Sequence, residues 1–214
     1  MNSPAPLTKG ERTRAHIVAT AAELFWRRNF HGVSVDQIAE AAKVNKATIY
    51  RYFADKNDIA LAVTRLNGEM SLEFVFAGSF AAFSEPQDRL AAIYRQVHCA
   101  QSQAGAEEGD IYGCPIVGLA LELGQELPKL REEASRIFVQ VEEMLTQVAR
   151  DAFASRGVTA DPTPLGRTLT QLLHGAFASA RLASNPEFIL DAGRASLALI
   201  GFPDTPILET ELAS

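Results

Sequence analysis

Residues 33–58 of this 214-residue chain, VSVDQIAEAAKVNKATIYRYFADKND, limit its fold more than any other stretch. The pattern predicts two short helices joined by a tight corner at Lys43 and Val44, with a longer helix directly after them. Helices of about two turns are unstable alone in water, so they must be packed between neighbouring elements. The stretch is therefore expected to form the centre of a small helical domain.

Capping residues mark where these helices begin. Ser34, with Gln37 three residues later, predicts a capping box at the first short helix. Asn45 is expected to cap the second, which runs to about Phe53, and Asp55 is expected to cap the long helix after it. Each predicted start therefore has a side chain that can accept the free N–H groups of the first turn.

The second short helix combines a buried face with an exposed one. Ile49 and Phe53 lie four residues apart and predict the face that packs inward. The opposite face is expected to be exposed and carries Lys46, Ala47, Tyr50 and Arg51. In a helix-turn-helix the second helix enters the major groove of DNA, where a small residue permits close approach and donors reach the base edges. The segment is therefore predicted to read DNA.

The charge distribution supports this prediction although the whole chain has a net charge of −6. Residues 1–60 hold nine Lys and Arg against six Asp and Glu, whereas residues 61–214 hold eleven against twenty. A basic N-terminal part can neutralise phosphates even when the rest of the protein is acidic. The alternative interpretation, an ordinary helical hairpin with a solvated basic face, requires charge, caps and the aromatic pattern to coincide by chance.

The run KVNKATIYRYFADKNDI, preceded by VSVDQIAEAA and an amphipathic first helix, resembles the DNA-binding domain of TetR-family transcriptional regulators over residues 10–60. The resemblance implies base contacts from Lys46, Ala47 and Tyr50. It also implies phosphate contacts, and with the exposed Arg51 the candidate DNA-binding set is Ser34, Lys46, Ala47, Thr48, Tyr50, Arg51, Tyr52 and Lys56.

One residue departs from the family pattern, because the corner commonly holds Gly where this chain has Lys43. A non-glycine residue with positive φ costs on the order of 1 kcal/mol. Either Lys43 adopts that conformation or the corner relaxes slightly, and the angle between the two helices depends on which occurs.

The rest of the chain predicts an all-α fold of about nine helices, since no segment shows strand alternation. We expect a flexible arm over residues 1–9, a helix-turn-helix domain over 10–56, a ligand-binding and dimerisation domain over 57–203 and a tail over 204–214. The fourth helix is expected to continue to about Phe80, the fifth to run from Pro86 to about Gln103, and residues 104–113 to form a loop.

The resemblance implies an apolar cavity for an inducer in the second domain. The candidate ligand-binding residues are Phe74, Tyr94, His98, Tyr112, Cys114, His174 and Phe177, with Phe76 as a further wall and Cys99 and Glu122 as further polar points. The alternative, which is the commoner role for such side chains, is that each of them is a packed core residue. Cys114, at a predicted helix start, is either a reactive sensor thiol or a small buried side chain.

The resemblance also implies a homodimer formed by the last two long helices. The expected interface residues are Leu169, Leu172, Leu173, Ala176, Ala180, Leu190, Ala195, Leu197, Ala198 and Leu199. The alternative is that this stripe is buried inside the monomer.

Several classes of site are disfavoured. Two cysteines make a disulfide framework implausible, no Cys/His cluster has zinc spacing, and no apolar run of about 18 residues occurs. We therefore expect a cytoplasmic protein with no metal, no cofactor and no membrane partner. The sequence contains no Ser/His/Asp set, no paired carboxylates and no phosphate loop that would indicate an enzyme.

The predicted function is a transcriptional repressor that binds a palindromic operator on double-stranded DNA and is released by an unknown small-molecule inducer. The alternatives are an activator, a ligand-independent DNA-binding protein, and a helical small-molecule-binding protein or enzyme that retains the head.

Overall fold

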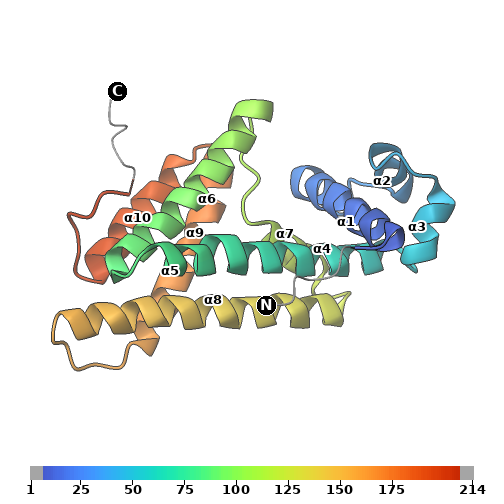
Figure 1. Cartoon of the computed structure of the whole chain (residues 1–214). Coiled ribbons are helices and arrows are strands. Elements are labelled where there is room, and N and C mark those ends of the chain that lie inside the picture. The colour runs from blue at the N-terminus through green and yellow to red at the C-terminus, as the bar shows by residue number, and fades with distance from the viewer. Residues whose placement is uncertain (1–6, 208–214) are drawn as a thin grey trace. The chain divides into compact units, whose positions relative to one another are not determined.

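The computed structural model describes residues 7–207, apart from the side chains of residues 107 and 108. The regular elements in that range are all helices, and none is a strand (Figure 1). The helices are α1 Lys9–Arg28, α2 Val35–Ala41, α3 Lys46–Tyr52, α4 Lys56–Met70, the π-helix η1 Ser71–Ala77, α5 Gly78–Ala82, α6 Pro86–Glu108, α7 Pro115–Leu123, α8 Pro128–Ser155, α9 Thr163–Ala183 and α10 Glu187–Leu199. Because α4, η1 and α5 follow one another without a break, these described elements form nine helical runs, which confirms the predicted all-α fold.

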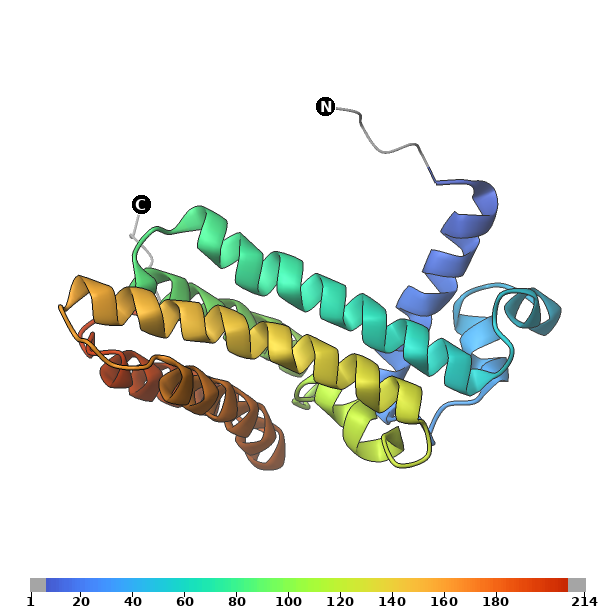
Figure 2. The same ribbon diagram turned by 90° about the horizontal axis from the view of Figure 1, so that it is seen from below.

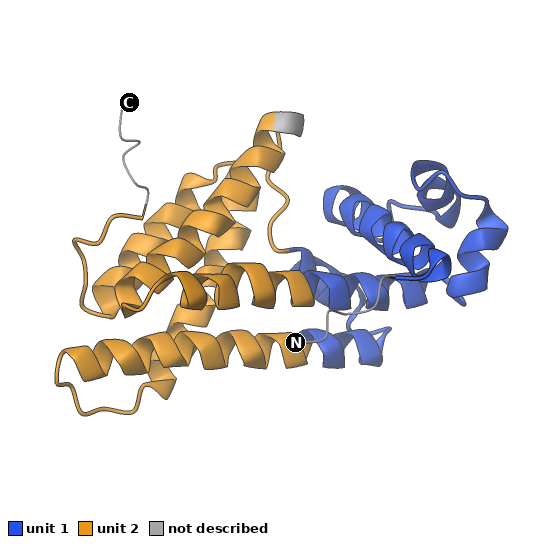
Figure 3. Ribbon diagram, viewed as in Figure 1, with its two compact units in different colours: residues 1–68, 115–134 blue, residues 69–114, 135–214 orange. Residues whose placement is uncertain are grey.

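The chain divides into two compact units that are interleaved along the sequence (Figure 3). Unit 1 consists of residues 1–68 and 115–134, and unit 2 of residues 69–114 and 135–214. The segment that carries α7 and the first turns of α8 therefore belongs to the same unit as the N-terminal helices. The sequence analysis expected a continuous N-terminal domain instead, because periodicity does not show which distant segments pack together.

Unit 1 has a continuous apolar core. α1 contributes Ile17, Ala21 and Phe25, all at most 3% exposed, as the predicted stripe requires. The short helices contribute Ile38 and Ile49, both 0% exposed. The later segment completes the same core with Leu119, Leu123 and Leu130. Burial between such neighbours is what stabilises helices that are too short to persist alone.

Unit 2 is built from α6, α9, α10 and most of α8. α10 packs against both α6 and α9 (Figure 2). Its core holds one fully hydrogen-bonded polar pair, since the hydroxyls of Tyr94 and Ser196 lie 2.7 Å apart. Burial of Tyr94, only partly offset by this hydrogen bond, raises the pKa of its phenol to about 12. The pair therefore stays neutral and serves packing.

The run from α4 to α5 contains a break in its periodicity. The expected single helix to about Phe80 is present, but η1 replaces the α-helical hydrogen bonds over seven residues. At the end of η1 the N–H of Gly78 donates to the carbonyl of Glu73, five residues earlier. Such a π segment adds a residue per turn and so changes which side chains face the core. Phe76 is 2% exposed here, while Phe74 is 60% exposed.

Two boundaries differ from the sequence-based expectation. α6 extends through residue 108, so residues 104–108 are helical and the expected loop starts only at Gly109, whose φ of 77° ends the helix. The chain after Pro203 is packed as far as Ile207, which is 5% exposed and whose carbonyl accepts a hydrogen bond from Arg95 Nε at 2.6 Å. Most of the expected arm and tail, residues 1–6 and 208–214, lies outside the described residues.

Most of the residues expected in the dimer interface lie in the core of unit 2. Leu169, Leu173, Ala176, Ala180, Leu190 and Leu197 are at most 5% exposed within unit 2. They are therefore monomer-core residues, as the alternative interpretation held. Ala195, Ala198 and Leu199 are exposed, and Leu172 is half-buried. Helical periodicity marks an apolar face without saying which partner covers it.

None of the helices within residues 7–207 combines the length and the apolarity that crossing a membrane would require.

Candidate nucleic-acid interface

The corner between α2 and α3 is held by local hydrogen bonds. Ser34 and Gln37 form the expected capping box at the start of α2, with Gln37 N donating to Ser34 Oγ at 3.2 Å. Asn45 Oδ1 accepts from both the backbone N–H and the hydroxyl of Thr48, at 2.7 and 2.8 Å. At each helix start the capping side chain thus accepts one of the free N–H groups of the first turn, as predicted.

Lys43 adopts the left-handed conformation in place of the usual glycine, with φ of 53°. The N–H of Lys43 donates to the carbonyl of Glu40, and the N–H of Val44 donates to that of Ala39, both at 3.0 Å. These two bonds define a Schellman motif, which closes a helix and turns the chain. The corner is therefore formed in full, and the first of the two expected possibilities for Lys43 is the one observed.

α3 presents the predicted faces. Ile49 is 0% exposed and Phe53, just after the helix, is 2% exposed, so both lie in the core. Tyr50 is 49% exposed, and Lys46, Ala47 and Arg51 are exposed beside it. Ser34 is also exposed, and Thr48 is half-buried against Asn45. The exposed face of α3 thus offers a small side chain, a cation and an aromatic hydroxyl to an approaching surface.

An acidic residue adjoins this face. The ammonium of Lys46 lies 2.9 Å from a carboxylate oxygen of Asp36 in the first turn of α2. The hydrogen bond and the charge of Asp36 raise the pKa of Lys46, so the ammonium stays charged. Since both side chains are at least half exposed, another anion can readily replace Asp36 as the partner of Lys46.

Arg51 and Tyr52 form a pair at the end of α3. The guanidinium of Arg51 lies 4.8 Å from the centre of the Tyr52 ring, and its Nη2 donates to the Tyr52 hydroxyl at 3.0 Å. The stacking holds a long, flexible cation in one orientation at the surface. Both residues were predicted, but their contact with each other was not.

Lys56 differs from its expected role as a phosphate contact. Its ammonium donates to the carbonyls of Phe30 at 3.0 Å and Val33 at 2.8 Å, and it lies 3.9 Å from the centre of the Phe30 ring. Burial lowers the pKa of this lysine, and the charge of Glu122 opposes that shift. Two of its three N–H donors are therefore used inside unit 1.

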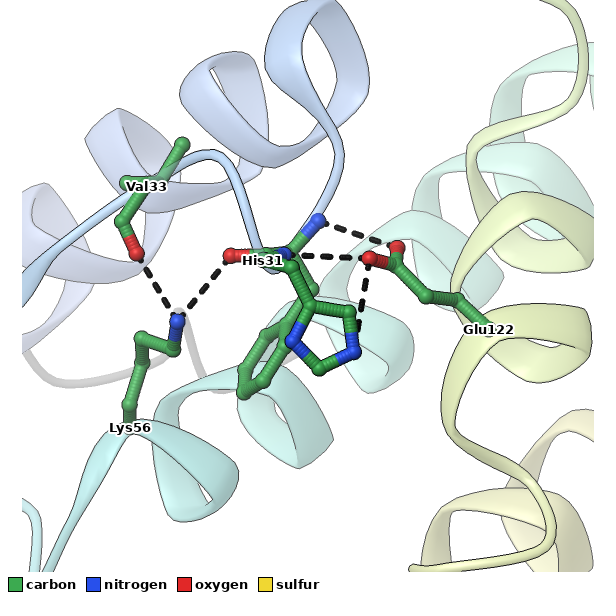
Figure 4. A network of polar contacts seen from close by, with 5 residues as sticks. His31, Val33, Lys56 and Glu122 are labelled. Atoms are coloured by element: carbon green, nitrogen blue, oxygen red, sulfur yellow. Dashed lines mark hydrogen bonds and ion pairs between the residues drawn. The ribbon is translucent and has the colours of Figure 1, made fainter.

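Glu122 of α7 contacts the same turn from the other side (Figure 4). Its two carboxylate oxygens accept the backbone N–H groups of Phe30 and His31, each at 3.0 Å. Glu122 was expected among the polar points of the inducer cavity, because the sequence gives no signal that it meets residues about ninety positions earlier. It is a structural contact of the DNA-reading unit instead.

Comparison with known proteins decides which family this architecture represents. The family of bacterial regulatory proteins named for TetR matches residues 17–63. The C-terminal domain described as that of the LmrA/YxaF-like transcriptional regulators matches residues 86–195, which is more than half of the chain. The chain belongs to the TetR family.

Relatives of this TetR-family chain agree with that assignment. The transcriptional regulator TcmR of Streptomyces glaucescens is 31% identical over 72% of this chain, a match that spans 64% of TcmR. The repressor NemR of Escherichia coli K12 is 24% identical over 82% of this chain and 87% of its own length. Membership makes the chain a transcriptional regulator with a helix-turn-helix DNA-binding unit.

Solved structures share the fold. The reduced form of Escherichia coli NemR covers 91% of this chain and 100% of its own, with a TM-score of 0.78 at 23% identity. A TetR-family regulator from Chloroflexus aurantiacus covers 91% and 96%, with a TM-score of 0.73 at 26% identity. The two-part helical architecture is therefore that of TetR-family regulators.

The candidate ligand residues of this TetR-family chain are only partly gathered. Tyr94 and Tyr112 are buried, and Phe177 packs against the core that contains Tyr94. Phe74, which lies in η1, is 60% exposed and so is not enclosed by unit 2. Phe76 is buried in that core, Cys99 is exposed and Cys114 is half-buried.

Two histidines of unit 2, His174 and His98, have buried ring nitrogens that make no hydrogen bond to the described residues. His174 stacks on Phe138 with ring centres 4.2 Å apart, and neither of its ring nitrogens has a hydrogen-bond partner within the described part of the chain. Burial lowers the pKa of His174 to about 4, so the ring is neutral near pH 7. His98 Nε2 lies 3.3 Å from Ser102 Oγ and 3.5 Å from Glu187, while its Nδ1 is buried without a partner.

Proposed function

We propose that the chain is a homodimeric repressor that acts in the cytoplasm, binds a palindromic operator through α3 and leaves it when a small-molecule inducer binds unit 2. The observation that carries the proposal is the exposed face of α3, with Lys46, Ala47 and Tyr50, next to a corner closed by caps and a Schellman motif. A recognition helix requires both an open reading face and a fixed orientation.

Base contacts are assigned to Lys46, Ala47 and Tyr50. Phosphate contacts are assigned to Ser34, Thr48, Arg51 and Tyr52, whose donors surround that face. Lys56 is left out, because its ammonium already donates to Phe30 and Val33. DNA must displace Asp36 from Lys46, and a phosphate or a guanine can do so since the ion pair is exposed.

Dimerisation is assigned to the exposed apolar side of α9 and α10. That side carries Ala178, Leu182, Phe188, Ala195, Ala198 and Leu199, of which Leu182 is 89% exposed. Two recognition helices must meet two half-sites about one turn of DNA apart, so a two-fold dimer matches a palindrome. Exposed apolar residues at helical spacing are the kind of surface that such an interface covers.

The inducer is assigned to unit 2, with Tyr94, His98, Tyr112, Cys114, His174 and Phe177 as candidate contacts. The unpaired ring nitrogens of His174 favour a ligand that carries a hydrogen-bond donor within an aromatic or apolar frame. Such a ligand releases DNA only if it binds the DNA-free state more tightly, and DNA must weaken its binding by the same factor.

The first test is selection of duplex DNA from a random-sequence pool by the wild-type chain. We expect selected sequences to be palindromic and Tyr50→Ala to weaken their binding by about ten- to hundredfold, the usual worth of one base contact. Phe74→Ala, which removes an equally exposed aromatic ring elsewhere, is the control and should bind normally. Undiminished binding by Tyr50→Ala at physiological salt contradicts the assignment of α3 as the reading helix.

The competing functions are separable by measurement. An activator raises transcription from the selected site, whereas a repressor lowers it. A ligand-independent regulator shows no compound that both raises the melting temperature and releases DNA. A ligand-binding protein or enzyme that merely retains the head would select no DNA sequence.

A further inference from the structure

Unit 1, which carries the helix-turn-helix, also includes a segment that is far from the helix-turn-helix in sequence. Residues 115–134 pack into unit 1, although the segments before and after them belong to unit 2. α7 contacts α1 and places Leu119 and Leu123 in the core around Ile17 and Ile38. Its one acidic side chain, Glu122, could have remained in solvent beside the exposed Leu121, yet it faces the turn between α1 and α2.

Glu122 contacts the backbone of that turn, and its Oε1 also lies 3.9 Å from Nε2 of the His31 ring. Oε2 accepts from Phe30 N–H and Oε1 from His31 N–H, each at 3.0 Å, so each oxygen takes one backbone donor. The side chain of Glu122 is 20% exposed. Hydrogen bonds to a carboxylate are about twice as strong as those between neutral groups. Only a carboxylate offers two acceptors to this pair of parallel donors.

The opposite side of the same turn is held by Lys56 of α4. Its ammonium donates to the carbonyls of Phe30 and Val33, so Phe30 is bonded through both its N–H and its C=O. Phe30 and Val33 are 5% and 2% exposed, and their peptide groups have little access to water. Figure 4 shows the turn between the two charged side chains, with Val33 on the side of Lys56 and His31 on that of Glu122. We call this arrangement the turn clamp.

The turn clamp acts on the residue that starts the helix-turn-helix. Val33 immediately precedes Ser34, which caps α2, and α2 leads through the Schellman corner into α3. A shift of the turn therefore moves the entry point of α2. Because α2 and α3 are too short to hold their own positions, their orientation depends on contacts of this kind.

We propose that Glu122 is a positioning residue for DNA binding: its carboxylate holds the turn between α1 and α2 so that α3 meets DNA in the required orientation. This inference rests on the proposed function, since it assumes that α3 reads DNA. It adds that a residue outside the helix-turn-helix, between two segments of unit 2, sets the affinity of the reading head. The segment 115–134 is joined to unit 2 at both of its ends, so the head is linked covalently to unit 2 there as well as through α4.

The test compares Glu122→Gln with Glu126→Gln in the full chain. Glutamine keeps the size of Glu122 but offers one acceptor instead of two, so one N–H of the pair loses its partner. Glu126 is exposed and lies just after the end of α7. Its substitution by glutamine makes the same change in charge in the same part of the chain. With the duplex that the wild type selects, we expect Glu122→Gln to raise the Kd about tenfold and Glu126→Gln to leave it unchanged.

Two further readouts and one condition on the Kd measurement separate positioning from simple loss of stability. The Kd is measured well below the melting temperature, where all variants are folded. The slope of log K against log salt should be the same for Glu122→Gln as for the wild type, because no phosphate contact is removed. In the free protein, amide hydrogen exchange at Phe30 and His31 should become about tenfold faster in Glu122→Gln alone.

Lys56→Met tests the other half of the turn clamp. If Lys56 is a clamp residue, the variant binds DNA more weakly with an unchanged salt slope. A slope smaller by about 0.9 for each bound chain would instead show that Lys56 contacts a phosphate, and would overturn its part in the clamp.

The outcomes keep the two proposals apart. If the wild type selects no sequence, the proposed function fails, and faster exchange at Phe30 and His31 still reports whether Glu122 holds the turn. If the wild type selects a duplex and folded Glu122→Gln binds it equally tightly, the positioning role is overturned while the proposed function stands.

Discussion

Lys43 carries a backbone conformation that glycine adopts at lower cost. Its φ of 53° is imposed by the Schellman motif that ends α2, since the motif needs a left-handed residue at this position. The chain therefore tolerates a local strain of on the order of 1 kcal/mol at the centre of its functional unit. The side chain is exposed, so the effect of substitution should come from the backbone.

We predict that Lys43→Gly raises the free energy of unfolding by up to about 1 kcal/mol, because the left-handed strain disappears while some unfolded-state entropy is gained. Lys43→Val should lower it by about 1 kcal/mol or more, since a β-branched residue fits this region poorly. Lys43→Asn, which removes the same charge and tolerates the conformation, is the control and should remain close to wild type. Equal effects of Val and Asn in urea unfolding would contradict the explanation.

His174 is a buried base whose surroundings oppose protonation. Its folded pKa of about 4 lies below the ordinary value of 6.5, and the cause is burial beside Phe138. Between these two pH values the unfolded chain binds a proton at this residue that the folded chain does not bind. Stability therefore falls as pH decreases from 6.5 toward 4 and is unaffected by this residue above 6.5.

We predict that His174→Leu removes this pH dependence. The unfolding free energy of the variant minus that of the wild type should increase as pH falls, by up to about 3 kcal/mol near pH 4. Denaturant unfolding of both proteins at several pH values measures it, because all other titrations are common to both. Parallel stability curves between pH 7 and 4 would show that His174 is accessible to protons in the folded state.

At the scale of the helix, packing of α9 against α8 depends on a missing side chain. A methyl group added at Gly166 would lie 2.6 Å from the Cα and 2.8 Å from the Cβ of Thr146. The nearest obstacle includes backbone, so the two helices would have to separate. The sequence showed a glycine in the first turn of a predicted helix, where nothing distinguishes a close approach from an ordinary helix start.

We predict that Gly166→Ala lowers the free energy of unfolding by about 2 kcal/mol, because overpacking forces the backbone to shift. Gly118→Ala in α7, where an added methyl group meets nothing within 4 Å, should instead be neutral or stabilise by about 0.5–1 kcal/mol through higher helix propensity. Calorimetric melting of both variants tests the contrast. A stabilising Gly166→Ala would mean that α8 and α9 are less closely packed than described.

For the whole molecule, the decisive surface is the exposed apolar side of α9 and α10. Leu182 is 89% exposed and Leu199 is 49% exposed, in a chain whose other large apolar residues are mostly buried. A regulator that recognises a palindrome needs a second copy, and this surface is the proposed contact with it.

We predict that Leu182→Asp converts the dimer to a monomer, because each interface would bury two unpaired carboxylates. Sedimentation should change from twice the chain mass of 23.2 kDa to that mass, with a loss of operator affinity. Leu121→Asp, at a residue that is 82% exposed on α7, is the matched control and should remain dimeric. A Leu182→Asp protein that stays dimeric would place the interface elsewhere.

The sequence by itself determined the local part of this protein. The helix starts at Ser34, Asn45 and Asp55, the inward face of Ile49 and the exposed face of Tyr50 follow from capping and a period of 3.6 residues. These effects act within a few residues along the chain, so they can be read from one segment without knowledge of any other.

Only the tertiary structure decided which distant segments meet. It assigned Glu122 to the turn at Phe30 and His31, committed Lys56 to the same turn, moved Phe74 to the surface and buried Leu169 and Leu197 within one chain. Such choices depend on close packing between elements whose separation along the chain carries no periodic signal. The head that reads DNA was therefore visible in the sequence, whereas the carboxylate that holds it became visible only in the fold.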